Sequence, residues 1–194
     1  MEMFAALGRT LGFSLTSGVN LYATVAILGL AARFDWVELP PQYDAFASDW
    51  VIGLALALYA VEFIADKIPW IDSVWDSIHT LIRPVGGALV AVTTVGEASP
   101  TFEVIMGLVG GTIAAGSHFT KASTRVAANA SPEPFSNWAL SFFEDVFVIG
   151  LGLLALKYPL AAFVITTLIL ISIVMAVRWI VRKLRGVRRV AVPA

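Results

Sequence analysis

Long apolar stretches constrain what this chain can fold into more than any other feature. Thr10–Ala32 and Leu160–Val177 each hold about the 20 apolar residues that a helix needs to cross the hydrocarbon core of a bilayer. Ala139–Leu156 and the glycine-rich Phe102–Phe119 are similar in length. Charged residues make up only 14% of the chain, against about a quarter in a typical globular domain. The sequence therefore predicts an all-α integral membrane protein rather than a soluble enzyme.

Two shorter segments, Trp50–Ala65 and Val85–Val95, raise the expected number of transmembrane helices to about six, in one polytopic domain over residues 1–194. Between them, Pro69–Arg83 has apolar residues at helical spacing on one side and charged residues on the other. We expect an amphipathic helix here, on the cytoplasmic side of the membrane, ending at Pro84.

Basic residues set the expected orientation, because lysine and arginine concentrate in cytoplasmic segments. With Thr10–Ala32 retained as an uncleaved first span and the N-terminus inside, eleven of the thirteen basic residues fall in cytoplasmic segments. Only Arg33 and Lys157 fall outside, and the 34–49 loop carries four acidic residues. The pattern predicts a multi-pass protein of the inner membrane with both termini in the cytoplasm and a basic cytoplasmic tail over 181–194.

A faint internal repeat aligns Gly12–Asn20 with Gly110–His118. Each copy is followed by a basic residue, two prolines and a Ser-x-Trp triplet: Arg33, Pro40, Pro41 and Ser48–Trp50 in one, and Arg125, Pro132, Pro134 and Ser136–Trp138 in the other. Two halves, 1–98 and 101–180, with three helices each would have opposite orientations, and inverted repeats of this kind are typical of transporters. The alternative is that glycine-rich apolar helices resemble one another by composition.

Polar residues inside the apolar segments are the candidates for an ion or solute pathway. A charge at Glu62 costs about 2.5–3.5 kcal/mol or more if it faces lipid, so we expect it to be buried beside a partner such as Lys121, Arg125 or His79. The predicted pathway residues are Asn20, Tyr22, Glu62, Asp66, Lys67, His118, Thr120, Glu144 and Asp145. The alternatives are close helix packing around Asn20 and His118, and purely structural ion pairs between Lys121 or Arg125 and the Glu144–Asp145 pair.

Asp72, Asp76 and His79 follow one helical stripe, at i, i+4 and i+7, and offer oxygen and nitrogen ligands to a divalent cation. No other cofactor is indicated, and the absence of cysteine excludes thiolate metal sites and cysteine nucleophiles. We favour the alternative that the stripe is a solvated helix face whose acids complement the positive end of the helix dipole.

Several motifs resemble one bacterial membrane-protein family. They are Ser17–Tyr22, Leu39–Pro41 with Ser48–Trp50 and, most specifically, the Glu62–Pro84 block with its acids, Lys67, Trp75, His79 and Arg83. They are similar to the family catalogued as domain of unknown function four-one-two-six, and the resemblance covers most of the chain. It implies a single membrane domain and draws attention to the Glu62–Pro84 block, but it carries no activity that can be transferred.

The leading hypothesis is a small transporter or channel for an ion or small solute, with membrane lipids as its surroundings and a homo-oligomer as a candidate assembly. The first alternative is a membrane-embedded enzyme that acts on lipid or headgroup at the cytoplasmic interface through Asp72, Asp76 and His79. The second is a helper subunit that packs other membrane proteins. The basic tail is not interleaved with aromatic residues, so a nucleic-acid partner is not expected.

Overall fold

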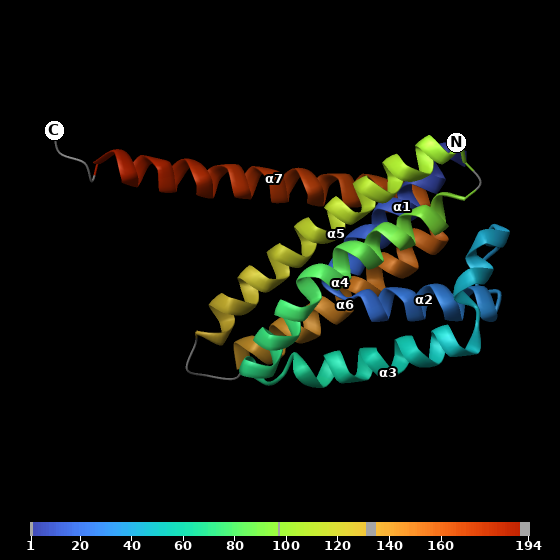
Figure 1. Cartoon of the computed structure of the whole chain (residues 1–194), viewed down its shortest axis with the longest axis horizontal. Helices are drawn as coiled ribbons and strands as arrows, with labels where there is room; N and C mark the ends of the chain where they lie inside the picture. The colour runs from blue at the N-terminus through green and yellow to red at the C-terminus, as the bar shows by residue number, and fades with distance from the viewer. Residues whose placement is uncertain (1, 97, 131–134, 191–194) are drawn as a thin grey trace.

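The computed structural model describes residues 2–96, 98–130 and 135–190, and over these ranges the chain is helical and contains no strand (Figure 1). The helices are α1 (Glu2–Val19), α2 (Leu21–Arg33), the short 3-10 helix η1 (Pro41–Phe46), α3 (Asp49–Ala65), α4 (Pro69–Val95), α5 (Pro100–Asn129), α6 (Phe135–Lys157) and α7 (Pro159–Val190).

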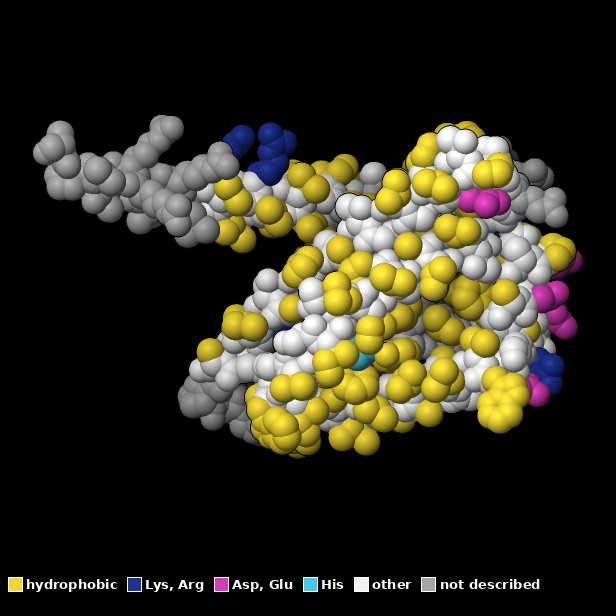
Figure 2. Space-filling model, viewed as in Figure 1, with side chains coloured by type: hydrophobic (Ala, Val, Ile, Leu, Met, Phe, Trp, Pro, Cys, Tyr) yellow, Lys and Arg dark blue, Asp and Glu magenta, His cyan; other side chains and the backbone are white. Residues whose placement is uncertain are grey.

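Four helices are long and apolar enough to cross a membrane: α4, α5, α6 and the Pro159–Lys183 part of α7. Large apolar side chains lie exposed along them, and Figure 2 shows apolar side chains spread over the visible flank of the molecule. These features identify a helical membrane protein. The expected number of six spans is not confirmed, because α2 is short and the Val85–Val95 segment is the second half of α4.

Small residues allow the helices to approach one another closely. A Cβ atom added to Gly110 would lie 2.3 Å from the Cβ of Ala91, and one added to Gly87 would lie 2.3 Å from that of Ala114, so α4 and α5 pack with little between their backbones. In α1, Gly12 lies against Ala155 of α6. Helix α1 lies in the middle of the bundle.

The first predicted span is not one helix but a hairpin of two, α1 and α2, which meet at Asn20. Asn20 has extended backbone angles (φ −149°, ψ 99°), and its Oδ1 accepts a hydrogen bond from the Ala23 N–H at 2.9 Å. This N-cap satisfies a donor at the start of α2 that the helix itself leaves free. The broken backbone is tolerated because Asn20 is buried in protein.

Both ends of this α1–α2 hairpin lie at the same end of the bundle. Thr94, near the end of α4, donates to Thr10 of α1 at 3.2 Å. At the end of α2, Arg33 pairs with Asp49, and the η1 residue Gln42 lies against Gly96, just after α4. The start of α1, the 34–49 loop and the α4–α5 connection therefore share one end.

The start of α1 and the 34–49 loop lie at the same end of the bundle, and α7 runs away from that end toward the C-terminus (Figure 1). The loop therefore does not lie at the opposite end of the bundle from the start of α1, as a single first span would require. The side of the membrane on which each terminus lies stays a prediction. Hydropathy misses the hairpin because two short apolar helices in series have the same composition as one long span.

The expectation that a helix ends at Pro84 is also wrong, since α4 continues from Pro69 to Val95 with Pro84 inside it. Neighbouring helices in a membrane bundle compensate for the hydrogen bond that proline removes. The glycines after Pro84 serve packing rather than termination, with Gly86 against Leu21 and Gly87 against Ala114. At the C-terminus, α7 continues to Val190, so most of the predicted tail is helical, and residues 191–194 lie outside the described part of the chain.

The aligned glycine segments are not related as an inverted repeat. Going along α1, Ser14 faces Gly110 and Gly18 faces Ala114 and Ser117, so α1 and α5 run in the same direction, whereas inverted halves 1–98 and 101–180 require opposite directions. Helix α5 is also unbroken at His118. Pro132 and Pro134, the second proline pair, lie outside the described residues.

Candidate functional site

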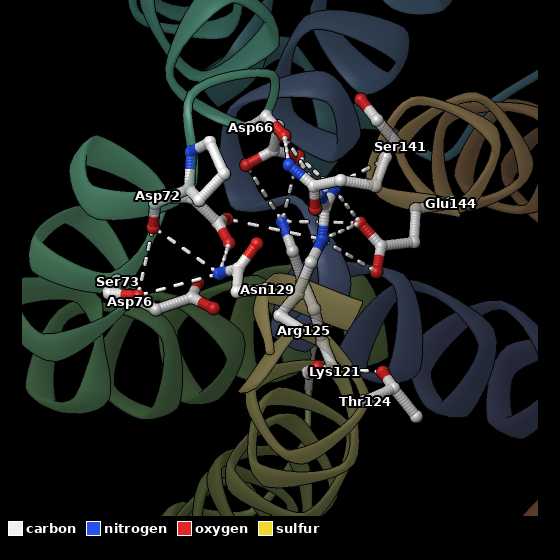
Figure 3. Close-up of polar contacts among 12 residues, drawn as sticks. Asp66, Asp72, Ser73, Asp76, Lys121, Thr124, Arg125, Asn129, Ser141 and Glu144 are labelled. Carbon is white, nitrogen blue, oxygen red and sulfur yellow. Dashed lines mark hydrogen bonds and ion pairs between the residues drawn. The ribbon is translucent and has the colours of Figure 1, made fainter. Parts of the chain in front are cut away.

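The candidate site is a cluster of buried charged side chains from four helices, which we call the charge network (Figure 3). It lies where α3 ends, α4 begins, α5 ends and α6 begins. Its members are the acids Glu62, Asp66, Asp72, Asp76 and Glu144 and the bases Arg83, Lys121 and Arg125. The sequence segments that supply them are up to about 80 residues apart, so the fold alone brings them together.

Arg125 holds the end of α3 against α6. Its Nη2 donates to Asp66 Oδ2 at 2.8 Å, its Nη1 donates to the Asp66 carbonyl at 2.8 Å, and Nε and Nη2 contact Glu144. Asn137 accepts from Arg125 Nη1 at 2.9 Å and donates to the same Asp66 carbonyl at 3.1 Å. A guanidinium has five fixed donors, which suits a position where three groups must be bound at once.

Lys121, one turn before Arg125, lies between three carboxylates. Its Nζ is 3.2 Å from Glu62 Oε1, 3.2 Å from Asp66 Oδ2 and 3.7 Å from Glu144 Oε2. The residue is only 4% exposed, and a buried ammonium requires opposite charges in contact with it. The expectation that Glu62 is buried beside a basic partner such as Lys121 is confirmed.

Arg83 extends the charge network toward α4 and α5. It donates to Glu62 Oε1 at 2.7 Å, to Asp76 Oδ1 at 3.1 Å and to His118 Nδ1 at 2.8 Å, and its side chain is fully buried. Sequence reasoning did not single out Arg83 as a partner of Glu62. The detectable signal was its place in an otherwise apolar part of α4, where a charge needs an acid nearby.

The contacts of His118 fix its protonation. Arginine only donates, so His118 Nδ1 accepts from Arg83, and its Nε2–H donates to Thr80 Oγ1 at 3.2 Å. The His118 ring is therefore neutral in this arrangement. His79 Nδ1 donates to the Trp75 carbonyl at 2.7 Å, and its Nε2 lies 2.8 Å from the Tyr22 hydroxyl, which can donate or accept.

Acids outnumber bases in this part of the molecule. Five carboxyl groups are buried, those of Glu62, Asp66, Asp72, Asp76 and Asp145, against the three buried bases Arg83, Lys121 and Arg125, while Glu144 and Lys67 are half-buried. Three carboxyl oxygens, Glu62 Oε2, Asp72 Oδ1 and Asp145 Oδ2, are buried without a hydrogen-bond partner among the described residues. An unpaired buried carboxylate is costly, so the surplus acids need protons or bound cations.

Other predicted pathway residues lie at the edge of the charge network. Tyr22, at the tip of the α1–α2 hairpin, reaches it only through His79, and Asn20 caps α2. Lys67 donates to Ser141 at 3.4 Å and lies over the Phe63 ring, where burial lowers its pKa. Thr120 is exposed and bonds the Gly116 carbonyl of its own helix, so it lies apart from the charge network.

The proposed metal ligands do not converge. Asp72 accepts from Asn129 at 2.9 Å, Asp76 accepts from Arg83, and His79 bonds to Tyr22. Over the described ranges, no three His, Cys, Asp or Glu side chains are grouped so that they could hold a metal ion. The stripe is not a solvated face either, because all three residues are buried.

Comparison with known proteins identifies a family but no individual relative. No curated protein and no solved structure matches the chain. The family described as Domain of unknown function (DUF4126) matches residues 7–179, which include every member of the charge network, all of α2 and most of α1. The chain therefore belongs to the DUF4126 family.

Proposed function

We propose that this protein is a small transporter or channel that carries cations across the membrane. The observation that carries the proposal is the surplus of buried carboxyl groups, five against three buried bases. Buried acids in a membrane protein commonly form proton relays or cation sites. The inverted repeat no longer contributes to this proposal.

Glu62 is the proposed centre of the pathway. Its Oε1 is shared between Arg83 and Lys121, while its Oε2 has no hydrogen-bond partner among the described residues, so one oxygen is held in place and the other can bind a proton or cation. Arg83 and Lys121 belong to different helices, and a change in the charge of Glu62 therefore alters the attraction between α4 and α5.

The proposed orientation follows the basic residues. We place the end with Lys67 and the basic part of α7 in the cytoplasm, and the start of α1 and the acidic 34–49 loop outside, in the inner membrane. Figure 2 agrees with this separation, because acidic side chains gather at the end where η1 lies. In this arrangement α3 to α7 cross the membrane, and the α1–α2 hairpin enters from outside and returns.

The interfacial-enzyme alternative is less well supported. It required Asp72, Asp76 and His79 to act on one substrate, but their side chains engage three different partners. The two acids of the stripe instead take part in the charge network, which joins helices α3 to α6.

The direct test is a flux assay in sealed proteoliposomes, with an interior pH dye for protons and tracer uptake for Na⁺ or K⁺. Wild-type protein should carry at least one of these cations, and Glu62→Gln, which keeps the shape but not the charge, should reduce flux by about tenfold or more, as loss of a group that carries charge at a functional site does. Asp44→Asn, an exposed acid in η1, is the matched control. Wild-type flux no higher than that of empty liposomes would refute cation transport.

A further inference from the structure

Between α4 and α5, next to the charge network, lies a cavity of about 140 Å³. On the α4 side it is lined by the carboxyl groups of Asp72 and Asp76 and the hydroxyl groups of Ser73, Ser77 and Thr80, and on the α5 side by Arg125 and the apolar residues Phe119, Ala122 and Val126. A cavity needs roughly 10–15 Å³ to hold one water, so this one has room for several. The pathway proposed around Glu62 does not include this cavity.

One buried group on the cavity is left without a partner. Asp72 is fully buried, and its Oδ2 accepts from Asn129 at 2.9 Å, but its Oδ1 has no hydrogen-bond partner among the described residues. The nearest base, Arg125 Nε, is 3.9 Å from Oδ1, and this guanidinium is already bonded to Asp66 and Glu144. The negative charge of Asp72 is therefore only weakly compensated.

The hydroxyl groups on the cavity use their protons within α4. Ser77 donates its proton to the Ser73 carbonyl, Ser73 to the Pro69 carbonyl and Thr80 to the Asp76 carbonyl. Thr80 and Ser73 also accept, from His118 and Asn129, so the Ser77 oxygen is the hydroxyl acceptor that suits a cation best. Carboxyl and hydroxyl oxygens together suit a small hard cation that keeps part of its water.

We propose that this cavity is a cation vestibule: a hydrated monovalent cation such as Na⁺ enters it and reaches the charge network past Asp72 and Asp76. That the cation moves on toward Glu62 rests on the proposed function. Which ions the cavity admits is a separate claim. Asp76 connects the two regions, because it lines the cavity and also accepts from Arg83, which contacts Glu62.

The absence of cysteine allows a test by single cysteines in the full-length chain. Ser77→Cys places a thiol on the cavity, and Ile78→Cys places one on the exposed flank of the same helix at nearly the same depth. Both variants are reconstituted in phosphatidylcholine nanodiscs, which carry no net surface charge. They are then treated with a positively charged or a negatively charged methanethiosulfonate reagent, and rates are normalised to those of free cysteine.

We expect Ser77→Cys to react about tenfold faster with the positive reagent. Two carboxyl groups line the cavity, while its one guanidinium, Arg125, is bonded to Asp66 and Glu144, and a cleft with excess negative charge concentrates cations by about 10-fold or more. Ile78→Cys should show no such preference. Adding Asp72→Asn to Ser77→Cys should remove most of it, with size-exclusion elution confirming that the double variant is folded. A Ser77 thiol that reacts equally with both reagents, fails to react, or keeps its preference without Asp72 overturns the vestibule.

Labelling does not require transport, so the two proposals can fail separately. Cation flux in liposomes without charge preference at Ser77→Cys overturns the vestibule and leaves the cation transporter standing. Charge preference without flux supports the vestibule and overturns transport.

Discussion

Arg83 Nη2 donates to Glu62 Oε1 at 2.7 Å, and neither side chain is exposed to solvent. Glu62 lies in the last turn of α3, whereas Arg83 is four turns into α4, so this ion pair joins two helices that otherwise share few contacts. Because of this pair, the position of α3 depends on whether Glu62 is charged.

Removing only one member of this pair should destabilise the protein strongly. Arg83→Gln leaves Glu62 and Asp76 without their closest base, and breaking a buried ion pair from one side costs about 3–5 kcal/mol. The double variant Glu62→Gln/Arg83→Gln should be less destabilised than the sum of the two single variants. Thermal unfolding in detergent measures this coupling. As a control, Asp49→Asn breaks the exposed Arg33–Asp49 pair and should have little effect. Strict additivity would show that the two residues do not interact.

Gly18 and Gly116 should respond in opposite ways to substitution by alanine. A Cβ atom at Gly18 would lie 1.9 Å from Ser117 Oγ and 2.1 Å from the Ala114 carbonyl oxygen, and because the second of these is backbone, α1 and α5 must separate. Nothing lies within 4 Å of a Cβ atom at Gly116, where alanine should stabilise the helix by about 0.5–1 kcal/mol. Melting temperatures of the two variants decide this. A similar loss in both would contradict the packing described.

The proposed orientation places Met3 and Ala45 on one side of the membrane and Trp70 of α4 on the other. Each is replaced by cysteine, one at a time, in the cysteine-free chain, and intact cells are treated with a membrane-impermeant maleimide. Met3→Cys and Ala45→Cys should be labelled, and Trp70→Cys only after lysis. If Met3→Cys and Ala45→Cys differ in accessibility, α1 and α2 form a single crossing and the hairpin is wrong.

His118 should tolerate a neutral acceptor but not a positive charge. Arg83 donates to its Nδ1, so His118→Asn keeps an acceptor near the same position, while His118→Lys sets an ammonium against the guanidinium. The lysine variant should lose thermal stability, and the asparagine variant should stay close to wild type. Equal stability of both variants would mean that the contact between Arg83 and His118 contributes little.

The charge network was partly predictable from the sequence because burying a charge is costly wherever the helix lies. That rule alone placed Glu62 in the bundle beside a base, and the structure confirms it with Lys121. The rule does not say which base is closest, and Arg83 became the main partner because α4 packs into the bundle instead of lying along the membrane surface. Proline and glycine are ambiguous in a membrane helix, since they end helices in water but pack helices in a bundle.

The α1–α2 hairpin was missed for a different reason. Thr10–Ala32 is apolar throughout except for hydroxyl groups and Asn20, and such a segment is equally consistent with one crossing or two half-crossings. The one local signal was Asn20 itself, since asparagine is among the best residues to begin a helix. The deciding contacts, Thr10 with Thr94 and Gln42 with Gly96, join residues more than 50 positions apart and are not encoded in any local pattern.

The hairpin also bears on how the protein is made. The hairpin carries the polar residues Ser14, Ser17 and Asn20, all of which are buried against other helices. Those helices include α4 and α5, which leave the ribosome later than α1 and α2. The interrupted backbone at Asn20 is tolerated only where protein surrounds it, so α1 and α2 reach their final position only after the later helices α4 and α5. Until α5 has been inserted, the α1–α2 hairpin stays at the membrane surface or bound to the insertion machinery.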